Sequence, residues 1–156
     1  LIQLTMPGVP DTYQGCELPT FTLVDPDNRG AVDFGVRREA LRSLLDDKLR
    51  TTATALRLRR EHPDWFDGYR PLRAAGPGAD HLVAFARSEH LIAAAARFSA
   101  HLHNAGGWHD TAITLPEAAW VDALSGREHA GGETPVTELL HGAAVALLVP
   151  AVSLTP

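Results

Sequence analysis

The stretch "LVAFARSEHLIAAAARF", residues 82–98, decides the kind of fold that this chain of 156 residues forms. It contains two apolar runs, 82–87 and 91–98, and the polar residues "SEH" lie between them. Short runs rich in Val, Ile, Leu and Phe that are bounded by turn signals are typical of β-strands. The alanines of the second run favour a helix by intrinsic propensity, but the position of this run between turns favours a strand.

Further short apolar runs lie on both sides of this stretch and are separated by glycine-rich turns. The turn signals are "AAGPGAD" at 74–80, "HNAGG" at 103–107 and "HAGGET" at 129–134. The expected strands are 69–75, 82–87, 91–98, 111–115, 119–124, 135–140 and 144–149. Six or seven short strands at this spacing are typical of an antiparallel all-β sandwich, and we assign this sandwich domain to residues 64–156.

Residues 32–62 show the pattern of an amphipathic helix. Apolar residues recur there at intervals of three and four, from Val36 to Leu56, so that they would share one helical face. Asp33 is a candidate N-cap, and the segment ends before Pro63. The residues "DDK" at 46–48 are compatible with a break, so one helix and two shorter helices both fit. On the solvent side, Asp46 and Arg50 are expected to pair at i,i+4.

The first five residues, "LIQLT", form an almost continuous apolar run. Such a run is typical of a strand that is buried on both faces of a parallel sheet. A strand, a polar loop and a helix, followed by an all-β module, are the layout of the last βα unit of a larger α/β barrel. We therefore expect residues 1–63 to be the last strand, substrate-facing loop and last helix of a (β/α)8 barrel.

The loop "GVPDTYQGCE", residues 8–17, directly follows the predicted strand. In (β/α)8 barrels the loops after the carboxyl ends of the strands build the active site. Tyr13 offers a ring for stacking and a hydroxyl, Gln14 an amide, and Asp11 and Glu17 carboxylates, which are groups that recognise sugars. Glycines in the loop allow a sharp turn or a close approach to a ligand.

A second polar segment, "DPDNRG" at 25–30, superficially resembles a calcium loop. Arg29 stands at the fifth position of that pattern and Val36 at the twelfth, where a glutamate is required, so the calcium interpretation fails. Two interpretations stay open, which are plain turn chemistry and recognition of a polyol. In the second, the ligand would contact Asp25, Asp27, Asn28 and Arg29.

Charge and composition exclude several classes of partner. The net charge of −5 comes from 19 acidic and 14 basic residues, and without a basic stripe no nucleic acid is expected to bind. No apolar run approaches the roughly 18 residues that a membrane helix needs, so no membrane contact is expected. Cys16 is the only cysteine, which fits a reducing compartment, and we expect a cytoplasmic protein.

The histidines at 101–109 suggest a metal site. His101 and His103 are two residues apart, so on a strand both rings would face the same side, and His109 follows. The alternative is a polar turn that happens to be rich in histidine. We expect neither a metal nor a cofactor, and we expect the three tryptophans in the core or at an interface rather than as sugar platforms.

Four segments together resemble a known family. They are "MPGVPDTYQGCEL" at 6–18, "FTLVDPDNRGAVDF" at 21–34, "ALRLRREHPDWFDGYRPL" at 55–72 and "WVDALSGREHAGG" at 120–132. The chain resembles the C-terminal portion of the maltooligosyl trehalose synthase family, a branch of the α-amylase clan (glycoside hydrolase family 13). It departs from the family pattern at Cys16, at Pro19-Thr20 and at Gly30-Ala31, where the family has Thr, Trp-Asp and Arg-Pro.

The resemblance implies a trehalose-forming reaction. The parent enzyme would convert the reducing-end α-1,4 linkage of a maltooligosaccharide into an α,α-1,1 linkage by intramolecular transglucosylation. In the family the catalytic carboxylates come from the fourth, fifth and seventh barrel strands, upstream of Leu1. No catalytic residue is therefore assigned, and we expect the isolated chain to be inactive. The substrate-binding candidates are Asp11, Tyr13, Gln14, Glu17, Asp25, Asp27, Asn28 and Arg29.

The resemblance also implies the partners of the chain. These are a maltooligosaccharide or glycogen-derived glucan and the upstream barrel of the same polypeptide. The shared loop pattern identifies the clan and does not encode the acceptor. Two alternatives therefore stay open, which are another amylase-clan hydrolase or glucan transferase and a non-catalytic carbohydrate-binding or structural β-module.

Overall fold

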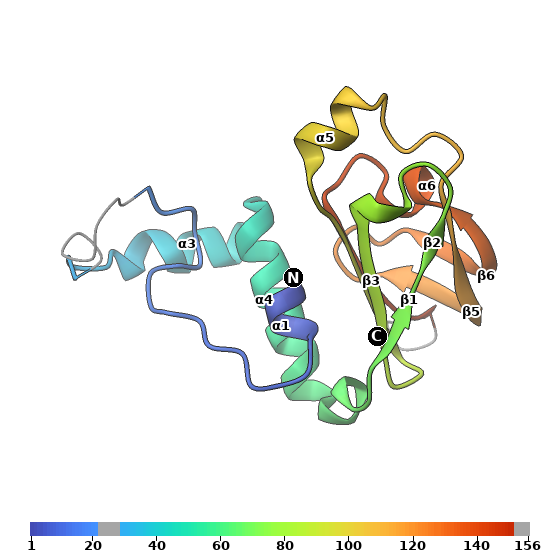
Figure 1. Cartoon of the computed structure of the whole chain (residues 1–156). Helices are drawn as coiled ribbons and strands as arrows, with labels where there is room; N and C mark the ends of the chain where they lie inside the picture. The colour runs from blue at the N-terminus through green and yellow to red at the C-terminus, as the bar shows by residue number, and fades with distance from the viewer. Residues whose placement is uncertain (22–28, 152–156) are drawn as a thin grey trace.

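A computed structural model of the chain describes residues 1–21 and 29–151. In these residues seven strands form one antiparallel sheet, in the hydrogen-bonded order β1-β3-β4-β7-β5-β2, with β6 paired to β5 (Figure 1). The strands are β1 (Arg70–Leu72), β2 (Ala74–Ala75), β3 (Leu82–Arg87), β4 (Leu91–Ala96), β5 (Ala112–Asp122), β6 (Glu128–Pro135) and β7 (Val145–Pro150). The predicted antiparallel all-β module is therefore confirmed.

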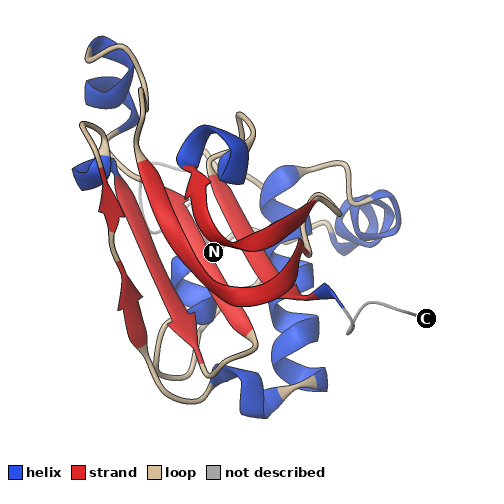
Figure 2. Ribbon diagram, turned by 90° about the vertical axis from the view of Figure 1, so that its right-hand side faces the viewer, coloured by secondary structure: helices blue, strands red, loops and turns tan. Residues whose placement is uncertain are grey.

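The sheet curls into a half-barrel, whereas a sandwich of two sheets was expected. β1 and β2 are neighbours in the chain, yet β1 pairs with β3 at one end of the strand order and β2 pairs with β5 at the other. Both edges must therefore approach each other, and Figure 2 shows the strongly curved strands that this requires. A β-bulge between Leu115 and Ala119 interrupts the pairing of the long strand β5, and bulges bend a strand and increase its twist.

The expected pair of strands 82–87 and 91–98 is confirmed as β3 and β4, although β4 ends two residues early, at Ala96. β4 is buried on both faces. Leu91 and Ala93 belong to the core cluster on one face of the sheet, and Ile92 and Ala94 to the cluster on the other. All four are fully buried, at 0% exposure. The alanine run is therefore a strand because both of its faces are covered, and this tertiary burial overrides the helical propensity of alanine.

One of the expected strands, 135–140, is wrong, and the expected strand 69–75 is two strands, β1 and β2. Residues 136–140 form helix α6 (Val136–Leu140), with Val136, Leu139 and Leu140 buried at helical spacing. The strand lies just before it, at β6, where a glycine turn was expected. Glycine is required at position 131 of this strand because a Cβ there would lie 2.6 Å from the carbonyl oxygen of Pro116 on the neighbouring strand. The expected strands 111–115 and 119–124 are parts of one strand, β5.

The helical segment 32–62 consists of two helices, α3 (Phe34–Ser43) and α4 (Asp47–Glu61). The expected N-cap is confirmed, because Asp33 Oδ1 accepts a hydrogen bond of 3.0 Å from the amide of Val36. Leu44 ends α3 with a left-handed backbone, φ +50°. Asp46 caps α4 by accepting from the amide of Leu49 at 2.8 Å.

The expected pair between Asp46 and Arg50 is absent, because the Asp46 carboxylate serves as this N-cap. Within the described residues, Arg50 forms its ion pair with Asp47 instead, with an N to O distance of 2.5 Å.

The predicted first strand is wrong, since residues 2–5 form the short helix α1 (Ile2–Thr5). A single strand would leave its backbone groups unpaired, whereas a helical turn pairs them locally. The amide of Leu4 donates to the carbonyl oxygen of Leu1, and that of Met6 to Ile2, both at 2.9 Å. Leu4 packs in one core cluster with Phe85 of β3, so the apolar run is buried without being a strand.

Residues 101–103 lie on helix α5 (Ser99–Asn104) instead of a strand. Positions two apart on a helix point about 200° apart, so His101 and His103 do not share a face. The described residues contain no group of three or more His, Cys, Asp or Glu side chains that could hold a metal ion. In the same residues, no helix is long and apolar enough to cross a membrane. The remaining short helices are η1 (Pro63–Phe66) and η2 (Ala79–His81).

Candidate functional site

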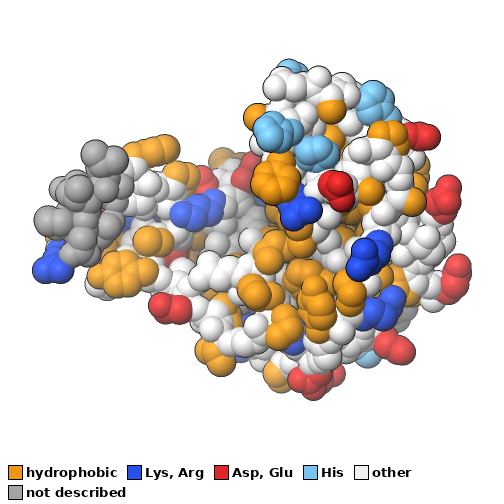
Figure 3. All heavy atoms as spheres, in the orientation of Figure 1, with side chains coloured by type: hydrophobic (Ala, Val, Ile, Leu, Met, Phe, Trp, Pro, Cys, Tyr) orange, Lys and Arg blue, Asp and Glu red, His pale blue; other side chains and the backbone are white. Residues whose placement is uncertain are grey.

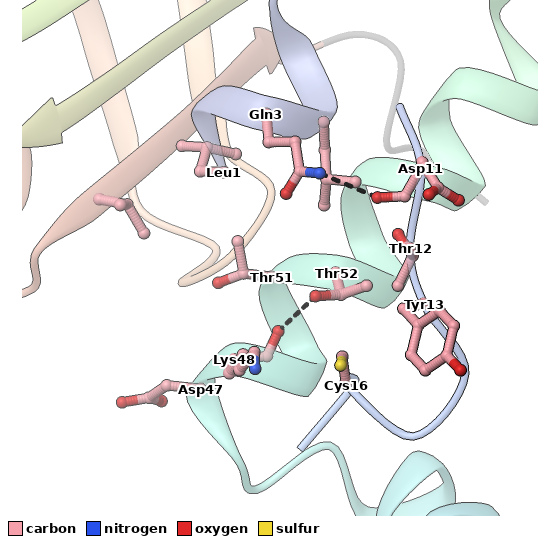
Figure 4. Close-up of a pocket in the computed structure, with 12 residues that line it drawn as sticks. Leu1, Gln3, Asp11, Thr12, Tyr13, Cys16, Asp47, Lys48, Thr51 and Thr52 are labelled. Atoms are coloured by element: carbon pink, nitrogen blue, oxygen red, sulfur yellow. Dashed lines mark hydrogen bonds between the residues drawn. The ribbon is translucent and has the colours of Figure 1, made fainter. Parts of the chain in front are cut away.

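The loop after α1 borders a hollow with a volume of about 630 Å³. Figure 4 shows this groove between α1, the loop and the first turns of α4. The residues that line it on the loop are Asp11, Thr12, Tyr13 and Cys16. The other lining residues are Leu1, Gln3 and Leu4 at α1, Asp47, Lys48, Thr51 and Thr52 of α4, and Val145 of β7. The lining therefore combines amide, hydroxyl, ammonium and carboxylate groups with one aromatic ring.

Two arginines hold the root of the loop. Arg59 donates to the carbonyl oxygen of Leu4 at 3.0 Å and to that of Gly8. Arg87 donates to the carbonyl oxygen of Thr5 at 2.6 Å and to that of Gly68 at 2.5 Å. The last carbonyls of a helix have no partner within it, and these guanidinium groups supply the missing donors at the end of α1.

Arg87 is an unusual buried cation. Its side chain lies in β3 with 5% of the residue exposed. Burial, together with the positive charge of Arg59, lowers the pKa of Arg87 from its ordinary value, and Asp67 partly opposes this. Since arginine keeps its proton under all ordinary conditions, the buried charge persists, and the hydrogen bonds to the two carbonyl oxygens compensate its lost hydration.

The middle of the loop is fixed by hydrogen bonds to its own backbone. Gln3 donates to the carbonyl oxygen of Asp11 at 2.8 Å (Figure 4), and Cys16 N donates to Tyr13 O at 3.0 Å. Gly15 has φ +88°, and a Cβ there would lie 2.9 Å from Val32 Cγ2. A larger residue is therefore excluded at Gly15 by both backbone strain and space.

Glu17 anchors the loop to α3. Its carboxylate accepts from Arg37 Nε at 3.3 Å, and the same guanidinium donates to the carbonyl oxygens of Gly15 and Asp33. The sequence analysis placed Glu17 among the sugar-binding candidates. In the structure this carboxylate is occupied by a partner on the neighbouring helix, and it holds the loop in place.

The structure brings Asp11 and Tyr13 together at the main groove. Tyr13 is 55% exposed and also lines a second hollow of about 300 Å³, which Gln14 and Arg37 share. Gln14 is exposed. Three of the eight candidates, Asp11, Tyr13 and Gln14, therefore present accessible side chains beside hollows.

The second candidate segment is only partly described. Arg29 is exposed at the edge of the described residues. The other three candidates of that segment, Asp25, Asp27 and Asn28, lie outside the described residues.

Sequence reasoning missed four cations that shape the site. They are Arg37, Lys48, Arg59 and Arg87; Lys48 Nζ donates to the carbonyl oxygen of Leu18 at 3.3 Å. Each of the four binds at least one backbone carbonyl oxygen that lies 22 to 82 positions away in the chain. Local sequence patterns do not predict such contacts, because an arginine that binds a distant carbonyl oxygen and an arginine that faces solvent occur in the same local sequence context.

Known proteins resemble this chain over nearly its whole length. No protein-family model matches the chain. The chain is 51% identical over 151 residues to proteins of two strains of Mycobacterium tuberculosis that are named as maltooligosyl trehalose synthases. These residues are 96% of the chain and 20% of the relatives, so the chain spans about one fifth of their length.

Solved structures give the same result. The maltooligosyltrehalose synthase of Arthrobacter ramosus matches with a TM-score of 0.90 and 43% identity, over 96% of this chain and 21% of that one. A Sulfolobus tokodaii structure, titled as a maltooligosyl trehalose synthase, matches with a TM-score of 0.63 and 24% identity, over 95% of this chain and 19% of that one, which supports the fold alone. The chain is therefore a homologue of the C-terminal part of maltooligosyl trehalose synthases.

Proposed function

We propose that the chain is the C-terminal part of an enzyme that rearranges maltooligosaccharides to trehalosyl-oligosaccharides. The enzyme would convert the reducing-end α-1,4 linkage into an α,α-1,1 linkage by intramolecular transglucosylation. The observation that carries the proposal is 51% identity over 151 residues to proteins of that name. The substrate would be a maltooligosaccharide or a glycogen-derived glucan, and the lone cysteine Cys16 supports a cytoplasmic, reducing location.

Within that reaction the loop at 8–17 would hold sugar. Asp11 and Tyr13 lie on one wall of the groove, with Gln3 and Lys48 on the helical wall. Carboxylate, phenol, amide and ammonium groups can accept and donate hydrogen bonds with sugar hydroxyls, and the half-exposed Tyr13 ring offers a stacking face. Gln14 and Arg29 would extend the same polar surface, whereas Glu17 would act indirectly by holding the loop on Arg37.

The bond-breaking step would require carboxylates from the rest of the polypeptide. A retaining glycosyl transfer uses a nucleophile and an acid/base carboxyl about 5 to 5.5 Å apart. We propose that an upstream (β/α)8 barrel supplies both, and that residues 1–63 pack on it. The exposed apolar side chains of α3 support such packing, because this helix buries none of its residues within the chain. Phe34 and Val36 of this helix are 47% and 54% exposed, and α3 extends to the left in Figure 1, with hydrophobic side chains exposed on the same part of the molecule in Figure 3.

A chimera tests the proposal directly. The chain would replace the corresponding fifth of the Arthrobacter ramosus enzyme, to which it is 43% identical, and the chimera would be incubated with maltopentaose. We expect a non-reducing product of unchanged chain length, and no product from the 156-residue chain alone. Release of glucose or shorter chains as the main product would instead indicate hydrolysis and contradict the proposal.

A pair of tyrosine variants tests the loop in the same chimera. Tyr13 and Tyr69 are 55% and 54% exposed, but only Tyr13 lines the groove. Replacing Tyr13 by alanine should lower kcat/KM about tenfold, as expected for one lost substrate contact. Tyr69→Ala is the matched control and should leave kcat/KM within about twofold. Equal effects of the two variants on kcat/KM would contradict the proposal that the loop binds substrate.

A further inference from the structure

Another hollow, distinct from the two beside the loop, lies on the half-barrel. It has a volume of about 300 Å³ and is lined by Arg70 of β1, Ser88 and Glu89 of the turn between β3 and β4, and Pro116, Glu117 and Trp120 of β5. We call it the rim pocket. It shares no lining residue with the loop groove. Its volume lies at the lower end of the range of small-molecule sites, which often occupy the mouths of β-barrels.

The walls of the rim pocket are held in place by the bulge of β5. Trp120 Nε1 donates to the carbonyl oxygen of Pro116 at 2.9 Å, which ties the bulged residues to the strand. A Cβ at Gly131 would lie 2.7 Å from the Cα of Glu117, so only glycine lets β6 support the bulge this closely. Trp120 is 2% exposed and forms a fixed floor rather than a stacking platform. Bulges commonly re-aim side chains beside functional sites.

The opposite wall is fixed as well. Ser88 Oγ donates to the carbonyl oxygen of Trp65 at 3.2 Å and accepts from the amide of His90 at 3.2 Å. These bonds set the turn that carries Glu89. The pocket is therefore bordered by three separate strand segments whose backbones are each tied to neighbours.

The charged groups of the rim pocket are available to a ligand. Arg70, Glu89 and Glu117 all line it, and within the described residues none of their side chains takes part in a hydrogen bond or ion pair. Together they offer guanidinium donors and carboxylate acceptors around one hollow. A ligand that fits must accept hydrogen bonds from the guanidinium and donate them to the carboxylates, and the hydroxyls of a polyol do both.

We propose that the rim pocket binds one hexose unit of a glucan, as a second contact remote from the loop groove. The choice of a glucan among polyols rests on the proposed function. A second contact on the same protein raises the local concentration of substrate at the first. The pocket should therefore increase the apparent affinity for long glucans, whereas it should not change the affinity for a chain too short to reach both sites.

The indole N–H of Trp120 provides a local probe, because its ring is the floor of the pocket. Maltose would be titrated into the ¹⁵N-labelled 156-residue chain while the Trp120 Nε1–H resonance is followed by NMR. We expect a saturable shift. Arg70→Ala and Glu117→Gln should each weaken binding about tenfold, as for the loss of a hydrogen bond to a charged group. The matched controls, Arg127→Ala and Glu138→Gln, change exposed residues outside the pocket and should leave the midpoint unchanged.

The outcomes separate this proposal from the proposed function. No saturable shift up to about 100 mM maltose, a concentration at which even sites with millimolar Kd would fill, would overturn the rim pocket as a sugar site. So would a response to arginine or methylammonium but not to maltose, which would indicate a cation site. Tyr13→Ala should leave the Trp120 response intact. If the chimera forms no trehalosyl product while maltose still shifts the Trp120 resonance, the proposed function is contradicted and the proposal that the rim pocket binds sugar is supported.

Discussion

Replacing Arg87 by methionine should lower the free energy of unfolding by about 3 kcal/mol. The guanidinium donates to the carbonyl oxygens of Thr5 at 2.6 Å and Gly68 at 2.5 Å. Each hydrogen bond to a charged group contributes roughly 1.5–3 kcal/mol, and an orphaned buried carbonyl adds a penalty. Methionine relieves the cost of burying a charge beside Arg59, and this partly offsets the loss. The two hydrogen bonds together would contribute about 3–6 kcal/mol, and the expected loss of about 3 kcal/mol in the free energy of unfolding is the low end of this range.

Urea unfolding followed by tryptophan fluorescence and by circular dichroism would measure this change. Arg87→Lys offers a graded comparison, because a single ammonium cannot span both carbonyl oxygens as the guanidinium fork does, and it should lose about half as much. Arg127→Met is the matched control. Arg127 is exposed in the turn between β5 and β6, so the change should stay within about 0.5 kcal/mol. A loss below about 1 kcal/mol for Arg87→Met would refute the role of Arg87 as a link between half-barrel and loop root.

Three further changes test the packing argument. Gly131→Ala should cost about 2 kcal/mol or more in thermal unfolding, because its Cβ would lie 2.6 Å from the carbonyl oxygen of Pro116; unchanged stability would show that the bulge can move. Asp46→Ala removes the N-cap of α4 and should cost about 1 kcal/mol, whereas Asp46→Asn should restore most of this. Glu17→Gln removes the ion pair to Arg37; it should change stability by less than about 1 kcal/mol but speed limited proteolysis of the loop, and an unaltered cleavage rate would contradict its anchoring role.

The elements that sequence patterns predicted well are those in which local and tertiary preferences agree. The predicted strands 82–87, 91–98 and 144–149 correspond to β3, β4 and β7, as their apolar composition between turns indicated. The periodicity of segment 32–62 predicted a helical segment without deciding between one helix and two, and Asp33 was recognised as a cap. Capping and amphipathic spacing act within a few residues, so they can be recognised in the sequence without the fold.

The failures have tertiary causes. The run "LIQLT" has the composition of a buried strand, but burial against α4 and β3 is achieved by a helical turn. The pair Gly131-Gly132 has the composition of a turn, but it lies inside β6, where the neighbouring bulge leaves no room for a Cβ at Gly131. Apolar composition indicates that a segment is buried, and glycine indicates a tight turn or a close approach of two backbones. Neither pattern indicates whether the segment is a helix, a strand or a turn.

The candidate site divides in the same way. The loop that lines the groove, with Asp11 and Tyr13, could be recognised from its polar composition and from the resemblance to a known family. The partner of Glu17 could not, nor could the arginines that hold the loop root, because these contacts join residues up to 82 positions apart. The rim pocket likewise brings β1, the β3–β4 turn and β5 together only through the curvature of the sheet.

By itself, then, the sequence determined that this chain has an antiparallel β-module preceded by amphipathic helices and a polar loop, and it identified the family. Turn signals and apolar periodicity suffice for the helices and strands, whereas the family was indicated by the resemblance of four segments to a known pattern. Only the tertiary structure decided that the sheet closes into a half-barrel, that residues 2–5 are helical, and which cations fix the loop. These features depend on which distant segments satisfy each other's carbonyl oxygens and fill each other's volume, and a linear pattern does not contain that information.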